Sequence, residues 1–510
     1  MLHPDDGAEL VSVNRAAIAA AVRALDLAAL AEERWFAAKG EVIGSARLAH
    51  AFALSPDAVL ALVDLHTGGG DGEGIGHREG RVERYAIPFA VRPDGTLVKA
   101  EEGDGVWLAL AVAIAEGRTI PALGRDPGDG ASAKGAGADA ALVCRPSPGF
   151  HDLWPDGAAD LAAVDEFALG RDQSNNSVVL GGSLLLKAYR RVSAGLNPDL
   201  ELTAYLSEEA EFPGVPRLAG WAEAITRNDG TGTIAMLQAF IGHAEDAYES
   251  TAEHLAALVG APGVVSLEWA TELAEDLGRL VAGLHAALAT PPAEAPDMTP
   301  RPATHDELKA WRFEAHRRLA KAITDVAFVD PDLAEELRDA GAHIAARASR
   351  FEAVVTPPMV MRIHADLHLG QILTADDGYR VIDFEGEPLR PIEERRRLDS
   401  PLRDVASLLR SLDHVARSAR RRAEKRHGGP IERPGLDIDA WIERARERFL
   451  AAYAAGLRRE AAPIVLDLDL LDAFEVAKEC YEFSYAATVL PSWLWAPRDG
   501  MRWLLAHGEA

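Results

Sequence analysis

The sequence predicts an α+β protein with a mixed N-terminal cap, a small strand-rich lobe and a large helical lobe. Three observations support this order. Short apolar runs between glycine-rich turns fill roughly the first half of the chain, apolar residues recur at helical spacing after Ser266, and a short strand-rich segment at 360–384 interrupts the helices. The length of 510 residues allows several domains, and 48% hydrophobic with 26% charged residues excludes a disordered or collagen-like chain.

The cap is expected over residues 1–125. Residues 14–33 are rich in Ala and Leu at helical spacing, which predicts a helix. Apolar runs then predict three strands, at 46–54, 59–64 and 83–91. A glycine-rich stretch of low complexity follows the cap, and we expect residues 126–139 to form a flexible linker.

Two lobes are expected after the linker. Residues 140–250 should contain the rest of the cap and the strand-rich lobe, with short strands at Ser177–Leu180 and Leu184–Tyr189. Residues 251–510 should form the helical lobe. Within it, the apolar positions of Trp269–Leu288 recur in steps of three and four, which predicts one amphipathic helix.

The composition also limits the cellular environment and the partners. No stretch approaches the roughly 20 apolar residues that span a bilayer, and the N-terminus carries acids where a secretory signal carries basic residues. We therefore expect a cytoplasmic protein. The two cysteines, Cys144 and Cys480, cannot form a disulfide framework. The formal net charge of −27 predicts repulsion of nucleic acid and anionic membranes, so we expect small-molecule partners, and a monomer.

The segment 360–384 and the residue after it contain the polar side chains with the clearest chemistry: His364, Asp366, His368, Gln371, Asp383 and Glu385. Phosphoryl transfer requires a carboxylate that accepts the proton of the attacking hydroxyl and oxygen ligands that hold Mg²⁺. Asp366 precedes Gln371 by five residues and Asp383 by seventeen, so a loop and a hairpin can direct all three to one point. We expect Asp366 to be the base, and Gln371, Asp383 and Glu385 to bind Mg²⁺.

Two other interpretations of residues 364–368 stay open at this point. His364, Asp366 and His368 also match the ligands of a zinc hydrolase, and the histidines could simply hydrogen-bond the loop. These five residues alone favour none of the three interpretations. The carboxylate of Asp383, which follows a hydrophobic strand and precedes Gly386, favours a kinase.

Here a family resemblance becomes specific. Residues 364–371 (HADLHLGQ) and 382–388 (IDFEGEP) resemble the aminoglycoside-phosphotransferase-like branch of the protein-kinase fold, and in particular bacterial maltokinases and actinobacterial glucosamine kinases. Further segments resemble the same family: 34–40 (RWFAAKG), 172–180 (DQSNNSVVL), 186–192 (LKAYRRV), 197–202 (NPDLEL) and 400–411 (SPLRDVASLLRS). The resemblance implies a two-lobed protein-kinase-like fold preceded by an α/β cap, and an ATP-dependent sugar kinase that uses Mg²⁺.

The resemblance also implies nucleotide contacts, for Lys187, Glu201, Ser174, Asn175, Gln238 and Phe240. Lys187 would bind phosphates with Glu201 as its ion-pair partner, and Gln238 and Phe240 lie in the expected hinge strand. Asp404 is expected to support the catalytic loop through hydrogen bonds to its backbone. Each role has an alternative. Lys187 could be a surface lysine, Ser174 and Asn175 could lie in a polar turn, and Gln238 and Phe240 could belong to an ordinary buried strand. A non-catalytic kinase-like binding module is disfavoured because the lysine, its partner, the base and the metal ligands are all present.

The C-terminal segment 474–497 is expected to select the sugar. Glu475, Glu479 and Glu482 share one helical face, which is either a solvated acidic surface or part of a binding site. Aromatic neighbours favour burial, and acids beside indoles suit a sugar with an ammonium group. We therefore expect the following residues to bind the substrate: Asp366, His368, Glu479, Glu482, Trp493 and Trp495.

The comparison with the maltokinase pattern points to the same substrate. The chain has Ala486, Thr488 and Leu490 where maltokinases have a glutamate and two arginines, and it adds Trp495. These departures favour glucosamine, phosphorylated at the 6-hydroxyl to glucosamine 6-phosphate. Maltose, phosphorylated to maltose 1-phosphate, is the alternative.

Overall fold

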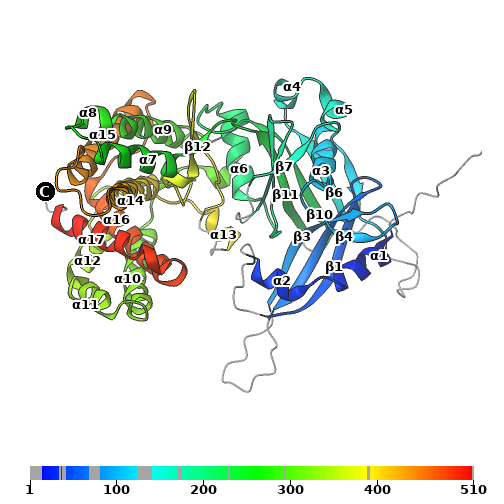
Figure 1. Ribbon diagram of the computed structural model, residues 1–510, viewed down its shortest axis with the longest axis horizontal. Helices are drawn as coiled ribbons and strands as arrows, with labels where there is room; N and C mark the ends of the chain where they lie inside the picture. The colour runs from blue at the N-terminus through cyan, green and yellow to red at the C-terminus, as the bar shows by residue number, and fades with distance from the viewer. Residues whose placement is uncertain are drawn as a thin grey trace, which may run out of the picture. The chain divides into compact units, whose positions relative to one another are not determined.

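The computed structural model describes residues 14–33, 36, 42–67, 81–124, 140–169, 175–227, 230–291, 295–386 and 391–507. The chain divides into two compact units. The N-terminal unit comprises Met1–Ala204 and Pro216–Gly242, and the C-terminal unit comprises Tyr205–Val215 and His243–Ala510. The first unit is built mainly on sheets and the second mainly on helices (Figure 1).

An antiparallel meander forms the first sheet of the N-terminal unit. Its elements are α1 (Arg15–Arg23), α2 (Leu27–Glu32), β1 (Ile43–Ala53), β2 (Ala58–Thr67), β3 (Arg81–Val91) and β4 (Leu97–Lys99). Every residue of β2 except His66 is buried, which fits its apolar sequence. The helix expected over residues 14–33 is broken into α1 and α2, because the Asp26 side chain accepts hydrogen bonds from the N–H groups of Ala28 and Ala29 and starts a new helix.

The second sheet of this unit has seven antiparallel strands in the order β5-β6-β10-β11-β9-β8-β7. The strands are β5 (Thr119–Pro121), β6 (Ala140–Pro146), β7 (Glu166–Ala168), β8 (Asn176–Leu180), β9 (Leu184–Ala188), β10 (Leu218–Thr226) and β11 (Gly230–Ala239). The accompanying helices are α3 (Val106–Ala115), α4 (Phe150–Leu153), α5 (Gly157–Leu161) and α6 (Pro198–Ala204). The apolar α3 packs on β6 and β10. The expected linker, 126–139, lies outside the described residues, and β5 and β6 on either side of it pair with each other.

Helices dominate the C-terminal unit. They are α7 (Ala247–Val259), α8 (Leu267–Ala270), α9 (Glu272–Leu288), α10 (His305–Ala327), α11 (Pro331–Asp339), α12 (Gly341–Ala348), α13 (Ile392–Arg395), α14 (Pro401–His427), α15 (Ile438–Arg459), α16 (Leu468–Val489) and α17 (Trp495–His507). The unit also contains the short π-helix η1 (Tyr205–Glu209) and the short 3₁₀ helices η2 (Pro296–Met298), η3 (Ser349–Glu352), η4 (Leu369–Gln371) and η5 (Pro491–Trp493). No helix among the described residues combines the length and the apolar character needed to cross a membrane.

Close packing fixes the helices near the site. The helices α9 and α15 approach so closely that a Cβ atom at Gly278 would lie 2.5 Å from the carbonyl oxygen of Phe449. The single helix expected at 269–288 is instead split, because the Thr271 hydroxyl donates to the carbonyl of Leu267 and ends α8 there.

Short strands position the functional loop between these helices. They are β12 (Glu245–Asp246), β13 (Arg301–Pro302), β14 (Met359–Val360), β15 (Ile372–Ala375) and β16 (Gly378–Val381). The strands β15 and β16 form the expected hairpin, and β12 pairs with β15. The strand β14 is only two residues long, and the chain then enters the loop that carries Asp366.

Candidate active site

The backbone of the loop before η4 has an unusual conformation next to Asp366. Ala365 has a φ of +70°, in the left-handed region that residues with a side chain rarely adopt. Asp404, in the first turn of α14, stabilises this conformation. Its carboxylate accepts hydrogen bonds from the N–H groups of His364 (2.8 Å) and Ala365 (2.9 Å). The prediction that Asp404 supports the catalytic loop is confirmed.

A buried network holds Asp404 in turn. His285 Nε2, from α9, lies 3.3 Å from the Asp404 carboxylate, and His285 Nδ1 lies 2.8 Å from the Tyr453 hydroxyl of α15. All three side chains are buried, and burial raises the pKa of Tyr453. His285 and Tyr453 could not be predicted from the sequence, because three helices far apart in the chain bring them together and no local spacing connects them.

The two histidines of the loop, His364 and His368, form hydrogen bonds within the protein. His364 Nε2 lies 3.0 Å from the carbonyl oxygen of Ile382, which ties the loop to the segment after β16. His368 accepts a hydrogen bond from the N–H of Gly370, and burial lowers the pKa of His368. Within the described ranges, no group of three potential metal ligands includes His364, Asp366 or His368. The geometry therefore gives no support to a zinc hydrolase.

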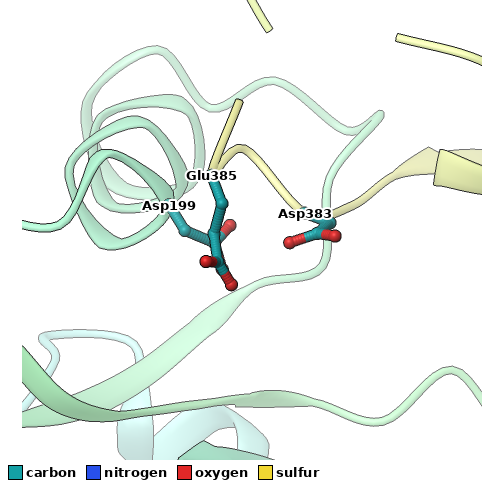
Figure 2. A group of neighbouring side chains, drawn as sticks. All are labelled: Asp199, Asp383 and Glu385. Carbon is teal, nitrogen blue, oxygen red and sulfur yellow. The ribbon is translucent and has the colours of Figure 1, made fainter. Parts of the chain in front are cut away.

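The three expected magnesium ligands lie directly before and after the hairpin of the C-terminal unit. Gln371 Nε2 donates to Asp383 Oδ2 at 3.2 Å, and carboxylate oxygens of Asp383 and Glu385 lie within 4.8 Å of each other. Figure 2 shows Asp383 and Glu385 on the turn that follows β16, and it also labels Asp199 on α6 of the N-terminal unit. Arg395 Nη1 lies 3.8 Å from Glu385, so this acid also has a cation of the protein beside it. An all-oxygen donor set with two neighbouring carboxylates fits a hard ion such as Mg²⁺.

Lys187 forms an ion pair in the N-terminal unit. Its Nζ lies 2.6 Å from Asp199 Oδ2, which also accepts a hydrogen bond from the Tyr189 hydroxyl at 2.9 Å. Asp199 is buried, and α6 begins beside it because Asn197 Oδ1 accepts from its N–H. Asp199, two residues before the expected partner Glu201, is thus an ion-pair partner of Lys187, and the role of Glu201 stays a prediction. The ion pair with a buried carboxylate excludes the alternative that Lys187 is an ordinary surface lysine.

The remaining expected nucleotide contacts lie in the second sheet. Ser174 falls outside the described residues, as do Arg34, Trp35 and Lys39 of the cap, and Asn175 is buried just before β8. In the hinge, Gln238 is buried and the N–H of Phe240 donates to the carbonyl of Ser183 at 2.8 Å. The N–H of Phe240 is therefore already bonded to protein, and an adenine would have to use other backbone groups.

The acidic face of α16 is buried and paired with cations, which excludes a solvated surface. Glu475 contacts Arg410 and Arg446, at 3.0 and 2.6 Å. Glu479 is completely buried, lies 2.9 Å from His414 Nε2, and has a pKa raised by burial against the pull of that histidine. His414 thus pairs with one Glu479 oxygen, whereas Oε2 is buried with no hydrogen-bond partner among the described residues, and the sugar contact of Glu479 stays a prediction.

Glu482, one turn further along α16, belongs to a cluster with the expected base. Lys478 Nζ lies 3.0 Å from Glu482 Oε1 and 3.5 Å from Asp366 Oδ1. We call these three residues the acid–lysine cluster. Burial opposes charge in this cluster, yet Lys478 keeps the pKa of Glu482 below its usual value, and the two carboxylates raise the pKa of Lys478. Lys478 was not among the residues predicted from the sequence, although its position four residues before Glu482 on a helix is a signal that could have identified it.

The expected sugar-stacking tryptophans are half-buried and touch each other. The rings of Trp493 and Trp495 pack edge to face at 4.8 Å, and Tyr248 of α7 lies beside Trp493. The Arg421 guanidinium lies 4.0 Å from the centre of the Trp495 ring, so it covers part of that ring.

Known proteins resemble this chain over most of its length. A glucosamine kinase from Streptacidiphilus jiangxiensis is 28% identical over 442 residues, which are 86% of this chain and 89% of the relative. A glucosamine kinase from Mycolicibacterium smegmatis is 28% identical over 365 residues, 69% of this chain and 82% of the relative. The solved structure of a glucosamine kinase in complex with glucosamine, ADP and inorganic phosphate has a TM-score of 0.67 at 24% identity, covering 96% of this chain and 99% of that one. The predicted kinase-like α+β fold is confirmed.

A match to a family model identifies the family to which the chain belongs. The model described as the phosphotransferase enzyme family, APH, matches residues 168–464, more than half of the chain. The matched residues include Lys187, the loop that carries Asp366, and the helix whose Asp404 supports that loop. The resemblance inferred from the short motifs is therefore confirmed, and the chain belongs to the phosphotransferase enzyme family.

Proposed function

We propose that this protein is an ATP-dependent glucosamine kinase, which converts ATP and D-glucosamine to ADP and glucosamine 6-phosphate. The observation that carries the proposal is the acid–lysine cluster, in which the expected base and a second carboxylate converge on an ammonium group. An amino sugar offers a ligand of the same kind. The similarity to two glucosamine kinases over most of the chain supports the same substrate.

The chemistry follows from the proposed roles of the residues. Asp366 accepts the proton of the sugar 6-hydroxyl. The oxygen of that hydroxyl forms a bond to the γ-phosphorus of ATP, while the bond from this phosphorus to the oxygen that leaves with ADP breaks. Lys187, held by Asp199, binds the nucleotide phosphates. Gln371, Asp383 and Glu385 would hold Mg²⁺, which when bound neutralises phosphate charge.

A coupled assay of ADP release against glucosamine, glucose, maltose and an aminoglycoside tests the proposal. We expect a higher kcat/KM with glucosamine than with glucose or maltose, because neither of those two sugars carries an ammonium group; preferred turnover of the aminoglycoside would contradict the proposal. A protein that turns over maltose and ignores glucosamine would contradict the proposal and would be a maltokinase.

The contribution of the substrate charge can be measured with Glu482→Gln. A hydrogen bond between a carboxylate and an ammonium is worth about 1.5–3 kcal/mol, against about 1 kcal/mol for a neutral bond. Glu482→Gln should therefore reduce kcat/KM more for glucosamine than for glucose. Glu447→Gln, on the exposed side of α15, is the control for loss of one negative charge. Equal losses on the two sugars would show that Glu482 does not recognise the amino group.

A further inference from the structure

Among the described residues, Lys478 is the basic side chain that contacts the proposed base, and its surroundings are unusual for a lysine on a helix. Its side chain is only 14% exposed, with Glu482 at 18% and Asp366 at 22%. The ammonium also lies 4.8 Å from the centre of the Tyr481 ring. Lys478 is therefore held from three sides, by two carboxylates and an aromatic ring.

Helix stability does not account for this placement. A lysine–glutamate pair four residues apart adds little to the stability of a helix, and the order with lysine first is the weaker one. Lys478 also reaches Asp366, a residue 112 positions away in the chain. The contact therefore connects α16 to the loop that carries the base.

We propose that Lys478 is a positioning residue for phosphoryl transfer, an internal counter-ion that holds one oxygen of the Asp366 carboxylate and leaves the other for the sugar hydroxyl. The inference rests on the proposed function in that Asp366 is the base. Among the described residues, no hydrogen bond reaches Asp366 Oδ2, in agreement with this division of the two oxygens.

Charge balance supports the same role. Without Lys478, Asp366 and Glu482 would be two like charges around one space, and they would repel each other. The nearby His368 cannot replace the lysine, because burial lowers its pKa and favours the neutral ring. With Lys478 the acid–lysine cluster carries one net negative charge, which matches the single positive charge of an amino sugar.

Three variants test the proposal on the intact protein with whichever sugar it phosphorylates best. Lys478→Met keeps the length of the side chain and removes the charge, so kcat should fall about tenfold or more while the KM for ATP stays within about twofold. Lys478→Arg keeps the charge and should retain several times more activity than Lys478→Met. Lys321→Met is the matched control, because Lys321 forms a pair of the same spacing with Asp325 on the exposed face of α10.

Chemical rescue separates positioning from a structural role. In Lys478→Ala, propylammonium chloride should restore part of the lost kcat, whereas potassium chloride at the same ionic strength should not. The unmodified protein and Lys321→Met should not respond to the amine. A kcat of Lys478→Met within twofold of the parent, or a loss in a folded Lys478→Ala that the amine does not restore, would overturn the proposal.

The two proposals fail in different ways. If the parent phosphorylates no sugar, the proposed function is wrong, and a double-mutant cycle on unfolding with Asp366→Asn and Lys478→Met then tests the contact itself. If the two substitutions change the free energy of unfolding additively, Asp366 and Lys478 are not coupled, and the proposed role of Lys478 is wrong. If the parent is active and the Lys478 variants match it, only the role of Lys478 is wrong.

Discussion

At the scale of single residues, the candidate site depends on two backbone conformations that side chains disfavour. Ala365 and Asp383 have φ values of +70° and +66°. Such conformations cost about 1–3 kcal/mol each and persist only where the surroundings impose them. For Ala365 the surroundings are the two hydrogen bonds to Asp404, which do not involve the side chain of Asp366.

Asp366→Asn should therefore preserve the fold and remove most of the turnover. General-base contributions are about 10²–10⁴-fold, and the loop conformation is maintained by Asp404 rather than by the substituted side chain. The measurement is kcat with saturating sugar and ATP, alongside the unfolding temperature. Turnover within a few-fold of the parent would reject Asp366 as the base.

Asp383→Asn should raise the Mg²⁺ concentration needed for half-maximal activity as well as lower the rate, because an amide binds a divalent cation less strongly than a carboxylate. Gln371→Ala should have the same effect in milder form, since it removes a neutral oxygen. Both are measured by titrating Mg²⁺ at constant ATP. An unchanged midpoint in Asp383→Asn would contradict its role as a ligand.

At the scale of secondary structure, local signals explain most of the elements and tertiary contacts explain the rest. Apolar periodicity located β1–β3, β8, β9 and the hairpin of β15 and β16. The broken helices were missed because the side chains of Asp26 and Thr271 interrupt them through hydrogen bonds to the backbone, which periodicity does not reveal. Asp199, His285 and Lys478 could not be assigned from spacing, because their partners are set by how distant segments pack.

The start of α10 gives a prediction at this scale. Thr304 and Glu307 form a capping box, and Glu307 also binds Arg301 in two places. These bonds lower the pKa of Glu307 from 4.5 to about 2, with the Arg301 hydrogen bond as the main cause. Because the folded-state pKa is depressed, the stabilisation is complete above about pH 4.5 and is lost as the pH falls toward 2.

Glu307→Gln should therefore lower the free energy of unfolding by about 1–2 kcal/mol at neutral pH, a value that allows for solvent screening of this partly exposed pair. The difference from the parent should shrink as the pH falls below about 4.5. Urea unfolding at several pH values measures it. Asp306→Asn is the control, since Asp306 occupies the same first turn and is 96% exposed. A difference independent of pH would contradict the assignment.

At the scale of the whole molecule, the family match explains why short motifs predicted so much. The match covers residues 168–464, so the fold and the phosphotransferase assignment follow from segments scattered along the chain. The domain boundaries expected from composition stay a prediction, as do the monomer, the cytoplasmic location and the individual site residues. The short motifs predict the identity of the sugar substrate least well, because sugar binding depends on which basic and acidic side chains the fold brings together.

Nucleotide binding should be visible in the stability of the entire chain. A ligand that binds only the folded protein stabilises it by about 2.7 kcal/mol at 100 times its Kd. MgADP should therefore raise the unfolding temperature of the parent and leave that of Lys187→Met nearly unchanged, because Lys187 is proposed to bind the phosphates. Lys309→Met, on an exposed face of α10, is the control. Equal shifts in the parent and Lys187→Met would reject the phosphate role.

The support that Asp404 gives to the loop also has a consequence for hydrogen exchange. The amide protons of His364 and Ala365 belong to neither a helix nor a strand, yet both point at one buried carboxylate. Solvent can reach them only when the first turn of α14 separates from the loop, so both should exchange with deuterium at the slow rate of the surrounding helices. A short pair of protected amides in an otherwise irregular segment would thus report, without any substrate, how often the site opens.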